Sequence, residues 1–333
     1  MNAPRTNTVS IVIPFYNEEV NAPLMLDAVS AAMTESKWPW EMIAVDDGSS
    51  DDTVNRLLAG AEKHGAHVRV VELSRNFGQT AAMQAGIVAA RGDVIVTLDG
   101  DLQNDPRDIP MMVGKLLDEK LDLVAGWRKD RQDKLMSRRL PSVIANRLIG
   151  RVTKVKIHDY GCSLKAFRAS VLKQVRLYGE MHRFIPAWLV TVSSPRRIAE
   201  VAVRHHARQH GVSKYGISRT IRVVLDLLVV YFFLRFKARP GHFFGVIGLL
   251  LGALGMAGLG WLAVVKFGFG ENIGNRPLLL TSIISLVASI QLLTTGVLAE
   301  MISRVFFATS AIPSFVVRDP EQAAPEVGWK LPS

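Results

Sequence analysis

Three carboxylates crowd around a glycine in the stretch VTLDGDLQNDP, residues 96–106, directly after a run of strand-forming residues. Asp99, Asp101 and Asp105 repel one another and shift each other's pKa, so the cluster costs stability unless a cation is present. An acidic turn on the surface is the plainer interpretation of an isolated D-x-D pattern. The elements that carry these side chains decide between the two.

The rest of the chain predicts an α/β fold that gathers the carboxylates at one edge of a sheet. Apolar runs that read as strands alternate with helical segments, which is typical of a mostly parallel sheet covered on both faces. The runs are 10–16, 41–47, 68–74, 93–99 and 122–128. Ligands bind beyond the carboxyl ends of such strands. Asp46 and Asp47 end the second run and Asp99 ends the fourth, which favours a metal site over an acidic turn.

The usual glycine motifs for phosphate binding do not occur in this sequence. The first strand runs into IPFYNEE rather than G-x-G-x-x-G, and the chain has no G-x-x-x-x-G-K-[ST] loop. A divalent ion that bridges carboxylates to a diphosphate does the same work by charge, and Mg²⁺ or Mn²⁺ takes hard oxygen ligands of this kind. We therefore expect a metal-bound diphosphate between the carboxylates in the working state.

Apolar residues are concentrated near the C-terminus. They make up 49% of the 333 residues, and the stretches 243–265 and 278–299 carry no charge. As a helix, each stretch spans the roughly 30 Å hydrocarbon core of a membrane. Two helices buried in a large soluble core are the alternative, but both stretches lack a polar face. The sequence therefore predicts a transmembrane hairpin.

Flanking charges predict the orientation of the hairpin. The outer ends carry Arg235, Lys237, Arg239 and Arg304, whereas the loop carries Lys266 and Arg276 beside Glu271. The positive-inside rule then places both chain ends in the cytoplasm. The N-terminal MNAPRTNTVS has no apolar signal core, which agrees with this orientation. The single cysteine, Cys162, cannot form an internal disulfide and fits a reducing compartment.

The net charge of +10 indicates an anionic partner. Nucleic acid is disfavoured because the chain has neither the basic-aromatic motif of an RNA-binding sheet nor zinc-finger spacing. An anionic membrane surface fits better, since each nearby Lys or Arg contributes about 1 kcal/mol. Residues 217–239 combine an apolar face with charges, and their uncharged core, 227–234, is too short to span a membrane. We expect this segment to lie along the interface as an amphipathic helix.

Seven motifs occur in order along the chain: IVIPFYNEE, VDDGSSDDT, LSRNFGQTAAMQAG, LDGDLQNDP, DYGCSLKAFR, GEMHRFIPA and SKYGISR. Together, over about residues 8–305, they resemble the family 2 glycosyltransferases of the Rossmann-like GT-A fold, and among these the polyprenyl-phosphate glycosyltransferases. The resemblance implies a GT-A catalytic domain at 1–216, an interfacial helix at 217–239, a transmembrane hairpin at 240–305 and a cytoplasmic tail at 306–333. It also implies a multi-pass protein of the bacterial inner membrane with a cytoplasmic catalytic domain.

The resemblance implies a role for each matching position. The residues implied for the nucleotide sugar are Pro14, Tyr16, Glu18, Asp47 and Asp99, and those for Mg²⁺ or Mn²⁺ are Asp99, Asp101 and Gln103. The residues implied for the acceptor phosphate are Arg128, Arg131, Arg138 and Lys214. Those implied for catalysis are Asp101 and Asp159. Asp159 could orient the nucleophile or act as a base, and a loop-capping aspartate is the alternative. The four basic residues could equally be solvated surface cations.

Two further groups of residues are interpreted with the same resemblance in view. Gly100 stands where the family usually has Ala, and we expect this change to affect loop stiffness more than chemistry. His205, His206 and His210 could suggest a metal, but a phosphate-facing or solvated role is favoured because their segment is expected at the lipid interface.

The implied reaction is an inverting displacement on a nucleotide sugar by the phosphate oxygen of a polyprenyl lipid, for modification of cell-envelope glycans. UDP-glucose and undecaprenyl phosphate are the predicted substrates, glucose because GEMHRFIPA and SKYGISR most resemble the glucosyltransferase branch of the family. GDP-mannose, a UDP-aminoarabinose derivative and a UDP-uronic acid stay open as donors. A processive polysaccharide synthase is disfavoured because Q-x-x-R-W is missing from the sequence. A nucleotidyltransferase and a non-catalytic nucleotide-binding membrane scaffold are the other rivals. Gly248, Gly252 and Gly255 form a small-residue ridge, and with the resemblance they predict a homo-oligomer, favouring a tetramer.

Overall fold

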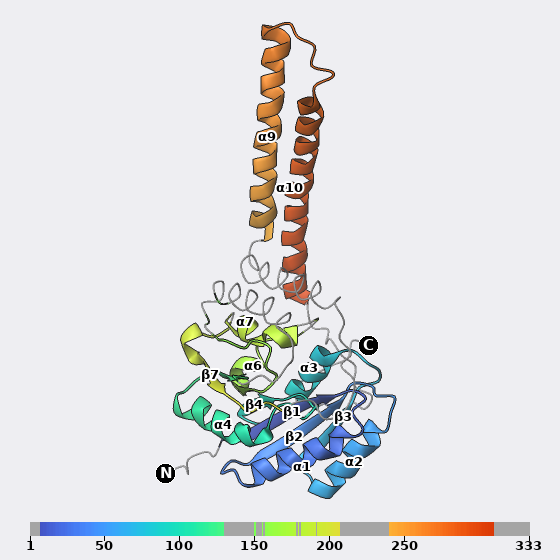
Figure 1. Ribbon diagram of the computed structural model, residues 1–333, viewed down its shortest axis with the longest axis vertical. Helices are drawn as coiled ribbons and strands as arrows, with labels where there is room; N and C mark the ends of the chain where they lie inside the picture. The colour runs from blue at the N-terminus through green and yellow to red at the C-terminus, as the bar shows by residue number, and fades with distance from the viewer. Residues whose placement is uncertain are drawn as a thin grey trace. The chain divides into compact units, whose positions relative to one another are not determined.

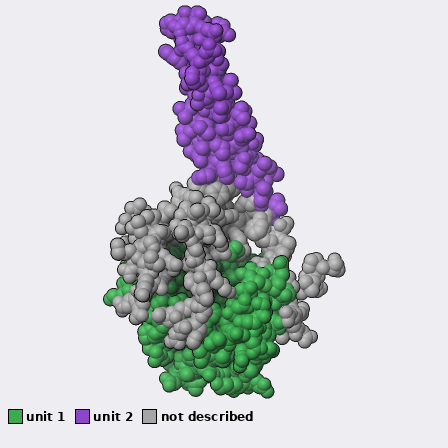
Figure 2. Space-filling model, turned by 45° about the vertical axis from the view of Figure 1, so that its right-hand side comes forward, with its two compact units in different colours: residues 1–227, 313–333 green, residues 228–312 purple. Residues whose placement is uncertain are grey.

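The computed structural model describes residues 7–129, 150, 155, 157–177, 179, 181–190, 192–206 and 240–309. The chain divides into two compact units, residues 1–227 with 313–333, and residues 228–312, which Figure 2 colours separately. The first unit holds the sheet and the second holds two long helices. The predicted interfacial helix at 217–239 lies outside the described residues, and the predicted domain boundaries stay a prediction.

The first unit alternates strands and helices from its start. Its elements are β1 (Val9–Phe15), α1 (Asn21–Thr34), β2 (Trp40–Asp46), α2 (Thr53–His64), β3 (Val68–Glu72), α3 (Gln79–Ala89), β4 (Val94–Thr97), η1 (Pro106–Asp108), α4 (Ile109–Asp118), β5 (Leu123–Trp127), β6 (Lys165–Arg168), α6 (Ala169–Leu172), η2 (Met181–Phe184), α7 (Ile185–Leu189), η3 (Pro195–Arg197) and β7 (Ile198–Ala202). All five predicted strands are confirmed as β1 to β5.

The described strands form a single sheet in the order β3-β2-β1-β4-β6-β5-β7. β1 to β4 pair in parallel, as do β5 and β7, whereas β6 is antiparallel to both β4 and β5. The chain moves outward from β1 to β3 and then returns to place β4 on the other side of β1. A ligand-binding crevice is expected at this reversal, beyond the carboxyl ends of β1 and β4.

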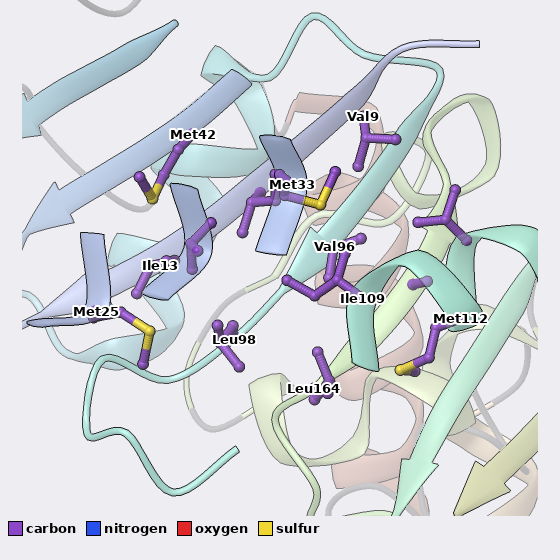
Figure 3. Close-up of a cluster of buried hydrophobic side chains, with 14 of the residues drawn as sticks. Val9, Ile13, Met25, Met33, Met42, Val96, Leu98, Ile109, Met112 and Leu164 are labelled. Atoms are coloured by element: carbon purple, nitrogen blue, oxygen red, sulfur yellow. The ribbon is translucent and has the colours of Figure 1, made fainter. Parts of the chain in front are cut away.

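Helices cover both faces of this sheet (Figure 1). Ile11 and Ile13 of β1 belong to a buried cluster that also holds residues of α1, α2 and α4, part of which Figure 3 shows. The intervening Val12 faces the other side, where Gly86 of α3 packs against Val12 and Val45. Burial on both faces explains why these strands are nearly continuous in apolar residues. It also leaves the carboxyl edge of the sheet as the place for polar chemistry.

The second unit is a hairpin of two apolar helices, α9 (Pro240–Gly268) and α10 (Pro277–Thr309). Both are long and apolar enough to cross a membrane, over Phe243–Gly268 and Pro277–Ile302, with mean hydropathies of 2.0 and 1.9. Only 11% of the most apolar 18 residues in each span are buried, whereas the core helix of a water-soluble domain is mostly buried. The predicted two-helix hairpin is confirmed, and its exposed apolar side chains suit a bilayer.

The glycine ridge predicted on the first span faces the second helix of the same hairpin. A Cβ added at Gly252 would lie 2.8 Å from Ser289 Oγ, and one added at Gly255 would lie 2.8 Å from Leu286 Cγ. The ridge therefore permits close approach of α9 and α10 within one chain. Because the ridge is used in this way, it gives no separate argument for contacts between chains, and the homo-oligomer stays a prediction.

Candidate active site

The acidic loop, residues 98–105, follows β4 at the point where the strand order reverses. Asp99 Oδ1 accepts a hydrogen bond from Gln79 Nε2 at 2.7 Å, and Gln79 is the first residue of α3. Asp101 Oδ1 accepts one from the backbone N–H of Gln103 at 3.2 Å. The loop turns at Leu102, whose φ is 59°. The structure therefore brings the three predicted metal-site residues to the carboxyl edge.

The electrostatics of this loop fit a divalent cation. Desolvation of the Asp99 carboxyl and then the charge of Asp101 raise the pKa of Asp99 to about 6, against the opposing effects of Ser163, Lys165 and Arg128. A cation beside these groups favours the ionised form of both carboxyls. Carboxylate and amide oxygens are the ligands that Mg²⁺ and Mn²⁺ prefer. The donor set of Asp99, Asp101 and Gln103 is thus compatible with the predicted metal.

The described residues hold no cluster of three or more His, Cys, Asp or Glu side chains placed to bind a metal ion. Mg²⁺ usually binds through one or two carboxylates and takes its other ligands from water and substrate phosphates, so this finding does not bear on the predicted metal.

Gly100 lies between the two aspartates and against the ring of Phe15. A Cβ on Gly100 would lie 2.6 Å from Cδ1 and Cε1 of Phe15, which is itself 1% exposed, and 3.2 Å from the Pro14 carbonyl oxygen. The expectation that Gly100 governs chiefly loop stiffness is therefore incomplete. In this chain the acidic loop rests directly on the end of β1, so an alanine at position 100 would require the Phe15 ring to shift.

Replacing Gly100 with Ala is expected to lower the free energy of unfolding by about 1–3 kcal/mol, because an overpacked buried ring must shift. The displaced loop should also weaken nucleotide binding. Chemical denaturation of the detergent-solubilised protein and calorimetric titration with nucleotide measure the two effects. Gly114→Ala in α4 is the matched control, since its Cβ would meet only Trp38 at an ordinary 3.7 Å. Equal effects of the two substitutions would contradict this account of Gly100.

Four of the five residues predicted for the nucleotide sugar, Pro14, Tyr16, Glu18 and Asp47, lie at or after the carboxyl ends of β1 and β2. Pro14 is the second-last residue of β1, and Tyr16, 37% exposed, follows the strand. The Glu18 backbone N–H donates to Thr53 Oγ1 at 2.8 Å, which ties this segment to the start of α2. Asp47 is 3% exposed and follows β2 directly. Their arrangement is compatible with a pocket at this edge.

Asp47 has a role that the sequence pattern did not indicate. Its carboxylate accepts the backbone N–H groups of Phe77 and Gly78 at 2.8 and 2.9 Å. Burial raises the pKa of this carboxyl, while the two hydrogen bonds act in the opposite direction. Asp47 thus fixes the loop that leads into α3, and the first residue of this helix is Gln79. In the same loop the Arg75 guanidinium lies 4.6 Å over the Phe77 ring, a cation at this edge that sequence reasoning missed.

On the other side of the acidic loop, Arg128 and Asp159 form a bidentate ion pair. Arg128 Nε and Nη2 donate to the two carboxylate oxygens of Asp159 at 2.7 and 3.0 Å, and the side chains are 11% and 12% exposed. Burial opposes the charge of Arg128, but the hydrogen bonds and charge of Asp159 raise the pKa of the guanidinium above its usual range. The other predicted phosphate-binding residues, Arg131, Arg138 and Lys214, lie outside the described residues.

Residues 159–165 are linked to the acidic loop through Asn104. Asn104 Nδ2 donates to Ser163 Oγ at 2.8 Å, and Cys162 Sγ donates to Asn104 Oδ1 at 3.5 Å. Thr97 Oγ1 donates to the Ser163 carbonyl at 2.9 Å. Lys165, 2% exposed, donates to the Cys162 carbonyl, and burial lowers the pKa of its ammonium group. Ser163 and Lys165 were not predicted, although both lie in the quoted motif DYGCSLKAFR.

The segment 203–206 holds the far side of the same loop. The His206 backbone N–H donates to the Gln103 carbonyl at 2.8 Å, and His206 Nε2 lies 3.3 Å from Asp105 Oδ2. Arg204 Nε and Nη2 donate to Asp108 Oδ1 at 2.9 and 2.7 Å. His206 therefore meets a carboxylate of the acidic loop. Of the other two histidines, His205 pairs its backbone with Asn104, and His210 lies outside the described residues.

Burial raises the pKa of the Cys162 thiol to about 11, against the opposing charges of Arg128 and Lys165. The side chain is completely buried. A thiol in this condition is not nucleophilic at neutral pH. Cys162 is therefore a packing residue of this site.

Comparisons with known proteins agree on one family. The model of "Glycosyl transferase family 2" matches residues 10–176. "Dodecaprenyl-phosphate galacturonate synthase" of Rhizobium johnstonii is 57% identical over 310 residues, 93% of this chain and 92% of that protein. "Undecaprenyl-phosphate 4-deoxy-4-formamido-L-arabinose transferase" of Pseudomonas aeruginosa is 36% identical over 326 residues, 98% of this chain and 93% of that protein.

A solved structure shares the fold of the sheet-containing unit. It is glucosyl-3-phosphoglycerate synthase from Mycobacterium tuberculosis in complex with Mn²⁺, UDP-glucose and phosphoglyceric acid. The match has a TM-score of 0.54 at 22% identity and covers 68% of this chain and 80% of that one. At this identity the likeness concerns the fold alone, and it confirms the GT-A architecture predicted from the motifs.

Proposed function

Because this chain belongs to glycosyl transferase family 2, we propose that it transfers a uronic acid, galacturonic acid in the first instance, from a UDP-sugar to a polyprenyl phosphate. The name of the relative that is 57% identical over nearly the whole chain supports this donor and this acceptor class. The arabinose transferase relative supports the same acceptor class. The glucose donor predicted from the motifs receives no support from these names, and the uronic-acid alternative replaces it.

The reaction places its main electrostatic demand on the leaving group. An oxygen of the lipid phosphate forms a bond to the anomeric carbon while the bond from that carbon to UDP breaks, with inversion. The attacking oxygen is already anionic at neutral pH, so the developing charge on the diphosphate dominates the barrier. Bound Mg²⁺ or Mn²⁺ would supply Lewis-acid stabilisation of that diphosphate. Asp99, Asp101 and Gln103 would hold the ion, and Gln79 and Ser163 keep Asp99 in place.

The ion pair between Arg128 and Asp159 supports an orienting role for Asp159 rather than that of a base. Both carboxylate oxygens are engaged by the guanidinium. A guanidinium has five N–H donors, and this pair uses two of its nitrogens, so Arg128 can also bind a phosphate oxygen. In this proposal Asp159 orients Arg128 toward the acceptor phosphate. Arg131, Arg138 and Lys214 are proposed to bind the same phosphate.

The apolar hairpin supports a membrane location, where a polyprenyl lipid is found. Two spans and the flanking basic residues lead us to propose a multi-pass protein of the bacterial inner membrane with its catalytic unit in the cytoplasm. The homo-oligomer, with a tetramer favoured, remains a prediction that light scattering in mild detergent can test.

A donor panel tests the proposed function. Purified full-length protein is incubated with undecaprenyl phosphate and, separately, UDP-galacturonate, UDP-glucuronate, UDP-glucose, a UDP-aminoarabinose derivative or GDP-mannose, and the lipid product is identified by mass spectrometry. We expect a uronate-lipid product, its loss in EDTA and its return on adding Mg²⁺ or Mn²⁺. Undecaprenol, which lacks the phosphate, is the control acceptor. A glucose-lipid as the main product would overturn the donor, and full turnover in EDTA would overturn the metal.

A further inference from the structure

Trp127, the last residue of β5, and the following Arg128 contact His158 and Asp159. Arg128 binds Asp159 through two hydrogen bonds. The residues that precede this pair in the chain, Trp127 and His158, stack their rings with centroids 4.5 Å apart and planes at 18°. The four residues therefore form a two-rung clamp between the end of β5 and residues 157–159. One rung is ionic and mostly buried, whereas the His158 side chain on the other rung is 70% exposed.

Glu200 of β7 fixes the exposed rung. Its carboxylate accepts the backbone N–H of His158 and lies 3.1 Å from His158 Nδ1 through both oxygens. The register pairs Ala125 with Glu200 and Trp127 with Ala202, so the side chains of Trp127 and Glu200 lie on the same face of the sheet. The Glu200 side chain is 14% exposed and needs a polar partner, which His158 supplies.

We propose that Trp127, His158 and Glu200 are positioning residues for sugar transfer, which act by holding Asp159 and through it Arg128. This rests on the proposed function, because Arg128 is assigned there to the acceptor phosphate. His158 directly precedes Asp159 in the chain, so the contacts that fix the His158 backbone also fix the start of the Asp159 side chain. Displacements of about 1 Å in a catalytic site can cost 10²-fold in rate.

The exposure of His158 separates positioning from stability. A side chain that is 70% exposed adds little to the apolar core, yet this one has a stacked ring, a carboxylate beside Nδ1 and a bonded backbone N–H. These contacts at a surface residue are explained if they hold the neighbouring Asp159 in one place. Loss of the exposed rung should therefore change turnover more than folding.

The test compares turnover and substrate affinity in full-length variants. His158→Ala is expected to lower kcat by about 10–100-fold, the usual range for residues that orient a functional group, while KM for the nucleotide sugar changes less than about twofold. His158→Phe keeps the ring stack and the backbone N–H donated to Glu200 and loses only the contact at Nδ1, so it should stay within about threefold of wild type. His67→Ala is the matched control, because it removes a ring contact with Trp40 at the opposite edge of the sheet and should leave kcat unchanged.

A second background distinguishes positioning from a general structural role. If His158 acts through Asp159, adding His158→Ala to Asp159→Asn should lower kcat less than about threefold further. An unchanged kcat in His158→Ala, a His158→Phe variant as slow as His158→Ala, or the same loss in both backgrounds would each overturn the inference. The ratios are measured with whichever nucleotide sugar the wild type turns over, so a wrong donor would overturn the proposed function and leave this test intact.

Discussion

Replacing Asp101 with Asn is expected to abolish sugar transfer, a loss of at least about 10³-fold, while the fold stays intact. The substitution removes one of the two negative charges that face each other in the acidic loop. Asn retains an oxygen that can accept the backbone N–H of Gln103, which Asp101 Oδ1 accepts at 3.2 Å, so the loop can keep its shape. The loss should therefore fall on stabilisation of the leaving diphosphate rather than on structure.

Initial rates in Mg²⁺ and in Mn²⁺, together with circular dichroism and thermal unfolding, measure this prediction. Asp118→Asn is the matched control, because Asp118 is an exposed carboxylate at the end of α4, away from the carboxyl edge of the sheet. That variant should turn over at the wild-type rate. Turnover near the wild-type rate by Asp101→Asn in either metal would refute the assignment of Asp101 to the metal site.

The parallel half of the sheet could be predicted because its strands are apolar on both faces. The sequences of β1, β2 and β4 are buried almost throughout, so each appears as a short apolar run. β6, with the sequence KAFR, and β7, with IAEVA, are short and carry charged residues. β6 enters between β4 and β5 in the antiparallel direction through long-range pairing alone, and a local pattern does not reveal such pairing.

The acidic loop could be predicted for a related reason. Asp99 and Asp101 directly follow a strand, so the rule for carboxyl ends places them without knowledge of distant contacts. The side-chain partners of Asp99 come from elsewhere: Gln79 begins α3, and Ser163 precedes β6. Asp47 is similar, because its hydrogen bonds go to residues 77 and 78 rather than to its own strand. Such partners are determined by tertiary packing, which residue types and spacing do not encode locally.

The enzyme class could be predicted from the sequence, whereas the donor sugar could not. The motifs correctly predicted a glycosyltransferase, and membership of that family excludes the non-catalytic scaffold and the nucleotidyltransferase. The glucose donor was inferred from GEMHRFIPA and SKYGISR, and the second of these lies outside the described residues. Sugar selectivity depends on loop contacts rather than on the motif that binds the diphosphate. The class of reaction is therefore easier to infer from sequence than the identity of the sugar.

The second large effect is expected at the pair Arg128 and Asp159. Asp159→Asn leaves a mostly buried guanidinium without its carboxylate, and breaking a buried ion pair in this way costs about 3–5 kcal/mol of stability. If Asp159 orients Arg128, kcat should fall by about 10²-fold and KM for the lipid phosphate should rise, because the guanidinium is no longer aimed. The pH profile of the remaining activity should keep its shape, whereas loss of a general base would change it.

Exchange of the two residues separates the structural from the functional role of the pair. The double variant Arg128→Asp with Asp159→Arg restores opposite charges at the same buried place and should recover much of the stability lost in Asp159→Asn. It should not recover transfer, because the guanidinium then starts from residue 159 rather than from the end of β5, and its free N–H groups point elsewhere. Unfolding free energies and kcat of the single and double variants measure both outcomes. Recovery of transfer by the exchanged pair would show that any buried ion pair suffices here, and that Arg128 does not receive the acceptor phosphate.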